Sequence, residues 1–247
     1  MPIDIFKGEY YSFKFEQFIK YICTLFSNKY IKEYFTRWIN ILNELNCISI
    51  LEYHQHMNTR ADYEKNNRRY EMFTHEVYLN NSYIPYIFHY DIEQILSRIP
   101  QKKYNKMKTK ELIEITRYDN SELLTKQQIK KSPIIIVPFA DVDSYYLVID
   151  GNKRLTYRVK KRKRITKYIL LNDINKSDFI LSCDWAMYFL YCEINKCLGF
   201  KKNFGESKVI EYLNSEGILN QQKFISDYEK TLKNESSDFS HNKYQPY

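Results

Sequence analysis

Glycine and proline are scarce in this sequence. Its 247 residues include only 5 Gly and 6 Pro, which argues against a loop-rich barrel or a collagen-like repeat. The five cysteines are an odd number, and no two of them form a CxxC pair. A disulfide framework or a zinc site is therefore not expected. No apolar run reaches the roughly 18 residues that a membrane-spanning helix needs, so no membrane span is predicted.

A secretory leader is also missing from the printed N-terminus. The opening residues, MPIDIFKGEYYSFKFEQF, contain no basic segment followed by an apolar core, so they do not predict a signal peptide. We accordingly expect a cytoplasmic protein.

The composition that remains is that of an ordinary globular chain. With 44% hydrophobic and 28% charged residues, it can bury a substantial core and does not resemble a disordered protein. The formal net charge of +8 favours anionic partners, either nucleic acid or nucleotide, through long-range attraction. A modest positive charge also keeps a protein soluble, so the charge alone leaves its purpose open.

Apolar residues at helical spacing dominate both ends of the chain. Residues 13–46 predict two helices or one broken helix, with the break at Ser27 and Asn28, and the polar residues 52–72 predict a solvated helix or a connector. After Asp173 the pattern is helical to about residue 230, and the residues from 233 onward are polar and tail-like.

The middle of the chain is mixed. Asp91 is expected to cap a short helix, residues 111–120 are interpreted as a strand, and residues 121–131 as another short helix. We therefore predict an α+β protein in three parts. These are a helical N-terminal region (1–74), a small mixed-sheet core (75–175), and a helical C-terminal region with a polar tail (176–247).

The most informative stretch is SPIIIVPFADVDSYYLVIDGNKRLTYRVKKRKRITKYILL, residues 132–171. β-branched and aromatic residues dominate two segments on either side of ADVDS, which predicts a hairpin. The second strand ends at Asp150 and Gly151, and a helix follows at once and continues to about Lys160. Residues 165–171 predict a further strand.

A strand that passes directly into a helix creates a small anion site, because the first N–H groups of a helix lack intrahelical partners. Gly151 permits a tight turn, and Asn152 can cap the helix or donate an amide hydrogen bond. Lys153 and Arg154 oppose the helix dipole unless an anion lies nearby. Asp150 is placed to bind Mg²⁺ or to accept a proton. A plain junction, with both cations pointing to water, is the alternative.

This stretch resembles the core of the ParB/sulfiredoxin superfamily, in which a helix, a strand and a hairpin lead to a DGxxR or GxxR motif that opens a helix. The resemblance extends from about Glu111 to Asp173, roughly a quarter of the chain. DGNKRLT is similar to the DGQQRLT of nucleotide-hydrolysing subunits in modification-dependent restriction systems. Asp150, Gly151 and Arg154 match the shared motif.

The resemblance implies nucleotide binding at this turn, used for switching on DNA, for phosphoryl transfer or for hydrolysis. Asn152 stands where sulfiredoxin has its catalytic cysteine, so sulfinic acid reduction is not expected. The ENxxR box and a helix-turn-helix are missing, which argues against a ParB clamp. Lys153 replaces the His or Gln of active relatives, so binding without turnover stays open.

A basic run follows the motif, and we expect it to form a phosphate-backbone patch. Its members cannot all share one face where the helix passes into a strand. They are Arg158, Lys160, Lys161, Arg162, Lys163, Arg164 and Lys167.

The leading hypothesis is Mg²⁺-dependent binding of a nucleoside triphosphate with hydrolysis or phosphoryl transfer, in a DNA-related or phage-defence process. Asp150 would bind the metal or act as base, and Lys153 and Arg154 would stabilise phosphate charge. Glu114 or Asp119 could supply a second carboxylate. A non-catalytic DNA-binding module and a metal-dependent nuclease are the alternatives. A homodimer or a partner subunit is compatible with each.

Overall fold

The computed structural model of the chain describes residues 3–4, 9–10, 13–66, 70–78, 85–99, 104–119, 132–141, 144–172 and 174–241. The fold is α+β, as predicted, with a small mixed sheet and flanking helices. The chain divides into two compact units. The helical unit comprises Met1–Tyr70, Thr74–His89 and Phe179–Tyr247, and the sheet unit comprises Glu71–Phe73 and Tyr90–Asp178.

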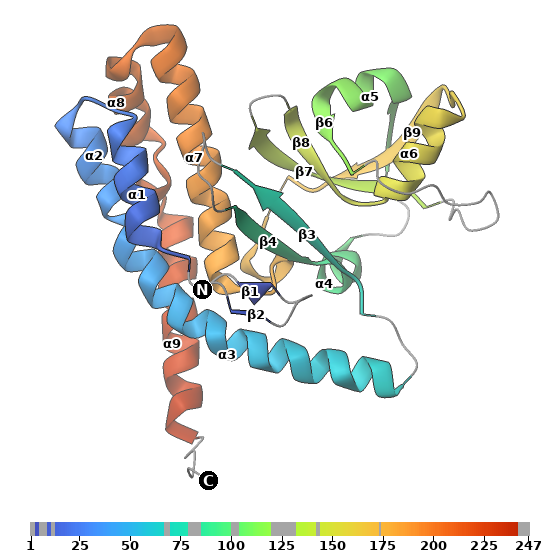
Figure 1. Cartoon of the computed structure of the whole chain (residues 1–247), viewed down its shortest axis with the longest axis horizontal. Coiled ribbons are helices and arrows are strands. Elements are labelled where there is room, and N and C mark those ends of the chain that lie inside the picture. Colours follow the sequence, from blue (N-terminus) through green and yellow to red (C-terminus); the bar gives the residue numbers. More distant parts are fainter. Residues whose placement is uncertain are drawn as a thin grey trace. The chain divides into compact units, whose positions relative to one another are not determined.

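The helical unit combines helices from both ends of the chain (Figure 1). Its long central helix, α7, is buried around most of its circumference, including Trp185, Leu190 and Ile194, as expected of a helix enclosed by others. Among the helices of the described residues, none combines the length and apolarity needed to cross a membrane. The α-helices of this unit are α1 (Phe15–Thr24), α2 (Lys29–Thr36), α3 (Trp38–Lys65), α7 (Ser182–Phe204), α8 (Glu206–Ser215) and α9 (Gln222–His241).

The predicted break at Ser27 and Asn28 is confirmed, and local chemistry explains it. The Asn28 side chain accepts a hydrogen bond of 2.9 Å from the Tyr30 N–H and so caps α2. The Glu206 carboxylate accepts the N–H groups of Ser27 and Asn28 at 2.8 and 2.7 Å. In the polar segment 52–72, helix α3 continues as far as Lys65. Most of this segment is therefore a helix, the first of the two predicted alternatives.

The first turn of α7 is tied to strand β4 (Tyr86–Asp91) by a buried carboxylate. Asp184 accepts hydrogen bonds from the Tyr86 hydroxyl at 2.7 Å and from the His89 N–H at 3.0 Å, and His89 Nδ1 lies 2.8 Å from the same carboxylate. β4 pairs with β3 (Met72–Val77), and two short strands, β1 (Ile3–Asp4) and β2 (Glu9–Tyr10), pair with each other.

The sheet unit contains a five-stranded sheet in the order β5-β9-β7-β8-β6. Strands β7 and β8 form the predicted antiparallel hairpin, β9 joins β7 in parallel, β5 joins β9 antiparallel, and β6 joins β8 in parallel. The strands are β5 (Asn105–Lys108), β6 (Thr116–Arg117), β7 (Ile134–Asp141), β8 (Ser144–Asp150) and β9 (Ile165–Leu170).

Helices α5 (Thr109–Ile115) and α6 (Asn152–Lys160) pack on one face of this sheet (Figure 1). Leu112 of α5 and Leu155 of α6 are fully buried in one apolar cluster with Ile134, Ile136 and Val148. The unit also contains α4 (Ile92–Arg98), which Asp91 caps as predicted by accepting the Gln94 N–H at 3.0 Å, and the 3-10 helix η2 (Lys176–Asp178).

Two expectations from the sequence are wrong. Residues 111–120 were expected to form a strand, but residues 109–115 form helix α5 and only Thr116–Arg117 form a strand. The burial of Leu112 against the sheet outweighs the β-propensity of the isoleucines in this segment. The predicted polar tail begins too early, since α9 continues to His241 through a stretch that has no Gly or Pro. The helix predicted over 121–131 lies outside the described residues.

Candidate functional site

The strand-to-helix junction has the predicted form. β8 ends at Asp150, Gly151 has a φ of +92°, and α6 begins at Asn152. This left-handed conformation favours glycine, and space requires it too. A Cβ at Gly151 would lie 2.7 Å from Cγ2 of Ile134 and 2.8 Å from Nε and Nη2 of Arg154. The guanidinium of Arg154 therefore passes directly over the turn.

Arg154 has an anion within its own motif. Its Nη2 donates to Asp150 Oδ2 at 2.7 Å, and its Nη1 hydrogen-bonds to the hydroxyl of Ser132. The Arg154 side chain is only 10% exposed, whereas that of Asp150 is 25% exposed. Nε of Arg154 is buried and has no hydrogen-bond partner among the described residues. The ion pair thus explains how a cation is tolerated in the first turn of α6 and fixes the orientation of the carboxylate.

Asn152 joins the motif to the segment after β6. Its Nδ2 donates to the Val148 carbonyl at 2.9 Å, and its Oδ1 accepts the Asp119 N–H at 2.8 Å. The Thr156 hydroxyl donates to the Asp119 carbonyl at 3.3 Å. Both residues considered for a second acidic group are exposed; Asp119 is held at the turn through its backbone, and Glu114 lies on α5.

Lys153 is exposed in the first turn of α6. The N–H groups of this turn cannot be satisfied within the helix, so an anion bound beside Gly151 could accept them. The turn thus offers backbone donors, one exposed ammonium and one partly exposed carboxylate. Ser132 is a member that the sequence did not suggest, because no pattern links a serine before a strand to an arginine 22 positions later.

The residues fit a magnesium ion only in company with a ligand's phosphates. Among the described residues no group of three or more His, Cys, Asp or Glu could hold a metal ion. Mg²⁺ on a nucleotide needs just one or two protein carboxylates, since phosphate oxygens and water supply the rest. Asp150 meets that requirement with the oxygen that Arg154 Nη2 does not bind.

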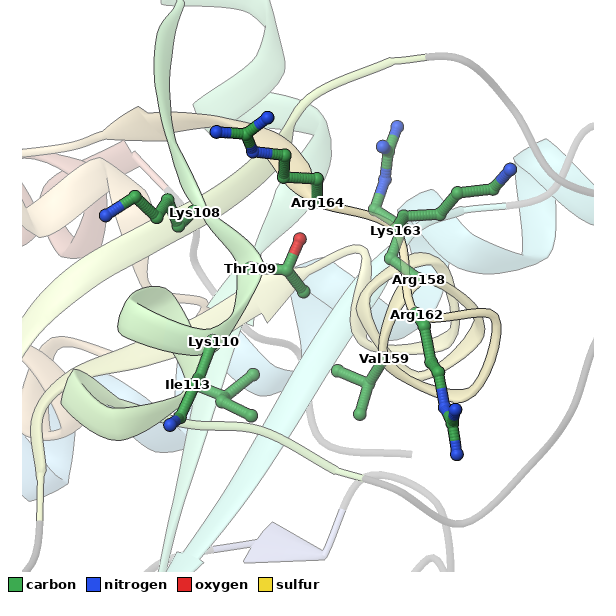
Figure 2. Close-up of a pocket in the computed structure, with 9 residues that line it drawn as sticks. All are labelled: Lys108, Thr109, Lys110, Ile113, Arg158, Val159, Arg162, Lys163 and Arg164. Carbon is green, nitrogen blue, oxygen red and sulfur yellow. The ribbon is translucent and has the colours of Figure 1, made fainter.

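A second feature, a cationic pocket, lies at the opposite end of α6 (Figure 2). Its volume is about 370 Å³. The start of α5, the last turn of α6 and the connection into β9 form its walls. The lining residues are Lys108, Thr109, Lys110, Ile113, Arg158, Val159, Arg162, Lys163 and Arg164.

The pocket divides the predicted basic run. Arg158, Arg162, Lys163 and Arg164 line it, whereas Lys160, Lys161 and Lys167 do not. Lys167 lies on β9, with its ammonium 4.4 Å from the centroid of the Tyr104 ring. A hydrogen bond from Lys167 lowers the pKa of Tyr104. Lys108 and Lys110 were not predicted; the available signal in the sequence was a lysine at every second position, Lys106, Lys108 and Lys110, although the structure places Lys110 on α5 and not on β5.

Comparison of the chain with protein-family models, with curated proteins and with solved structures found no match. The resemblance to the ParB/sulfiredoxin superfamily therefore stays a prediction based on the motif and its surroundings.

Proposed function

We propose that the turn between β8 and α6 binds the phosphates of a nucleoside triphosphate together with Mg²⁺. We further propose that the protein hydrolyses the nucleotide or transfers its terminal phosphoryl group, in a cytoplasmic, DNA-related process such as phage defence. One observation carries this proposal. A partly exposed carboxylate, Asp150, is held by the buried Arg154 directly beside the left-handed Gly151 that opens α6.

Each residue of the turn has a distinct part in this proposal. The oxygen of Asp150 that does not bind Nη2 of Arg154 would contact the metal or accept a proton from the attacking group. Arg154 would orient that carboxylate through the hydrogen bond from its Nη2 to Oδ2 of Asp150. Lys153 and the first N–H groups of α6 would neutralise phosphate charge. Bound Mg²⁺ would polarise the phosphoryl oxygens.

The test is calorimetric titration of the protein with ATP, GTP, CTP and UTP in the presence of Mg²⁺, together with an assay of phosphate release. Lys153→Gln removes one exposed charge and should weaken binding of the preferred nucleotide about 5- to 10-fold. Asp150→Asn keeps an oxygen for Arg154 and should abolish both the Mg²⁺ requirement and phosphate release. Lys202→Gln, exposed on α7, is the matched control and should change neither.

Binding of none of the four nucleotides would refute the proposal. Binding that Lys153→Gln and Asp150→Asn leave intact would place the nucleotide elsewhere. Binding without phosphate release would establish a nucleotide switch without turnover. This outcome stays open because Lys153 stands where active members of the ParB/sulfiredoxin superfamily have His or Gln.

A second candidate function, a non-catalytic DNA-binding or regulatory module, is favoured by the cationic pocket. The pocket and the turn occupy opposite ends of α6, about 12 Å apart at 1.5 Å per residue. The protein could bind a nucleotide at the turn without binding DNA at the pocket, or the reverse. Separate experiments can therefore test the two functions.

A further inference from the structure

The cationic pocket concentrates positive charge without a matching number of carboxylates. Six of its nine lining residues are Lys or Arg, and none is acidic. Of these six cations, only Lys108 has an ion-pair partner among the described residues, namely Glu111, at 2.6 Å. Like charges gathered at one place repel one another. An anionic ligand would relieve this repulsion.

Helix chemistry explains only part of this cluster. Cations near the C-terminus of a helix are favoured by its dipole, which accounts for Arg158 in the last turn of α6. The Arg158 Nη1 also donates to the Ile165 carbonyl at 3.3 Å. Neither effect applies to Lys110, at the beginning of α5, or to Arg164, directly before β9. These cations come from separate segments, and only the fold brings them together.

Arg162 shows that the positive charge is retained against the preference of the backbone. Among the described residues other than glycine, Arg162 is the one whose φ is positive, at +49°. Its N–H bonds the Val159 carbonyl at 3.0 Å, and the Lys163 N–H bonds the Arg158 carbonyl at 2.9 Å. These two bonds define a helix-terminating motif whose left-handed position usually holds glycine. Strained residues of this kind concentrate at functional sites.

Lys110 and Arg162 extend toward the same side of the pocket. Figure 2 shows Ile113 and Val159 between these two residues, whose charged ends extend in the same direction on either side. The aliphatic pair contacts the core of the sheet unit. Two apolar side chains that pack against the core thus separate two cations, and no ion pair within the described residues involves either of them.

The positive surface continues beyond the pocket along the β5–β9 edge. Lys108 and Lys106 are two positions apart on β5 and so share one face of the sheet, about 6.8 Å from each other. Lys106 pairs with Lys167 in the register of β5 and β9. A single phosphate cannot contact cations spread over this length, whereas a polymer of phosphates can. The arrangement therefore favours a polymeric ligand.

We infer that the cationic pocket is a contact site for the phosphate backbone of duplex DNA. No lining residue is aromatic, so the pocket has no platform on which an unpaired base could stack. The pocket is suited to phosphates, and contacts to phosphates do not depend on the base sequence of the DNA. We therefore expect binding that is independent of base sequence. This inference deepens the second candidate function and is independent of nucleotide binding at Gly151.

The test measures the affinity of the full-length protein for a fluorescent duplex of about 20 base pairs by anisotropy, between about 50 and 200 mM NaCl. Lys110→Gln and Arg162→Gly should each weaken binding about 3- to 10-fold and reduce the slope of log K against log salt by about 1. Arg162→Lys keeps the charge and should stay within about twofold of wild type. Lys160→Gln and Lys161→Gln, which remove equal charge from the same run outside the pocket, are the matched controls.

Arg162→Gly separates a binding defect from a folding defect. Glycine suits the left-handed position, so this variant should unfold at a temperature no lower than that of wild type while it binds DNA more weakly. Equal losses in the pocket variants and their controls would overturn the inference in favour of a diffuse basic surface. A wild-type protein that does not bind duplex at about 50 mM NaCl, or that prefers single strands, RNA or inorganic triphosphate, would also overturn it. Nucleotide titrations of the same variants should match wild type.

Discussion

At the scale of single residues, the strand-to-helix turn requires glycine at position 151. Two independent constraints act on it, a φ of +92° and the close approach of Ile134 and Arg154. The first excludes most side chains because a Cβ is strained in the left-handed region. The second excludes even a methyl group, since both neighbours are held in place, Ile134 in the core of the sheet unit and Arg154 by its ion pair with Asp150.

Gly151→Ala should lower the free energy of unfolding by about 2–4 kcal/mol, the sum of backbone strain and overpacking. Urea denaturation measures this loss. Two other glycines serve as comparisons. Gly205 combines a φ of +83° with a ψ of 176° and has open space around it, so Gly205→Ala should lose about 1–3 kcal/mol from backbone strain alone. Gly199, within α7 and also in open space, should gain about 0.5–1 kcal/mol as alanine. A loss at Gly151 no greater than the roughly 1–2 kcal/mol of left-handed strain would contradict its close contacts with Ile134 and Arg154.

At the scale of elements, one buried carboxylate joins four parts of the helical unit. Glu193 of α7 is 1% exposed. Its Oε1 accepts the Tyr34 hydroxyl of α2 at 2.9 Å and the Ile218 N–H of η3 (Ile218–Asn220) at 2.6 Å, and its Oε2 accepts the Trp38 Nε1–H of α3 at 3.2 Å. Burial raises the pKa of the Glu193 carboxyl to about 7. Burial, with the charge of Glu193 as a second cause, also raises the pKa of Tyr34.

The stability of the protein should therefore depend on pH through Glu193. Its native pKa of about 7 lies above the ordinary value of 4.5, so the native state binds the proton more tightly than the unfolded chain. The stabilisation is complete below about pH 4.5 and is lost as the pH rises through about 7. Between pH 5 and pH 8 this group should reduce the free energy of unfolding by about 2–3 kcal/mol.

Urea denaturation at intervals of pH checks this expectation. Glu193→Gln removes the titrating group and retains an acceptor oxygen, so the difference between wild type and variant isolates the contribution of Glu193 from that of the histidines. That difference should shrink steadily as the pH rises. A difference that is constant across the range would show that Glu193 stays ionised, held by its three donors.

At the scale of the whole molecule, the net charge belongs to one unit. The sheet unit contains 20 of the 38 Lys and Arg residues but only 12 of the 30 Asp and Glu residues, so it carries the full +8. The helical unit contains 18 of each and is neutral. An anionic partner that is attracted over long range is therefore directed to the sheet unit, which contains both the turn and the pocket.

Removing charge from the neutral unit should then leave DNA affinity nearly unchanged. Lys20 and Lys202 are exposed on α1 and α7. The double variant Lys20→Gln/Lys202→Gln has the same net charge as a double pocket variant, Lys110→Gln/Arg162→Gly. Anisotropy at one salt concentration should give less than a twofold loss for the first and at least about a tenfold loss for the second. Similar losses would mean that overall charge, and not the pocket, governs binding.

Much of the secondary structure could be predicted because its signals are local. The cap at Asp91, the interruption at Ser27 and Asn28, and the passage from strand to helix at Gly151 each depend on residues within one turn of the chain. The interpretation of residues 111–120 as a strand was wrong because the local signal is too short. A segment of seven residues, such as α5, contains too few repeats to separate a helical period of apolar residues from a strand period. The burial of Leu112 decided between helix and strand.

The sequence by itself determined the α+β class, the hairpin with its DGNKR turn, and the excess of positive charge, since these follow from local propensity, periodicity and composition. Only the tertiary structure decided that Arg154 pairs with Asp150 and Ser132, and that Lys108 and Lys110 join Arg162 and Arg164 in one pocket. The physical reason is packing. The apolar cluster that seats α5 and α6 on one face of the sheet brings together cations that are about fifty positions apart in the chain, and such a contact leaves no trace in any local pattern.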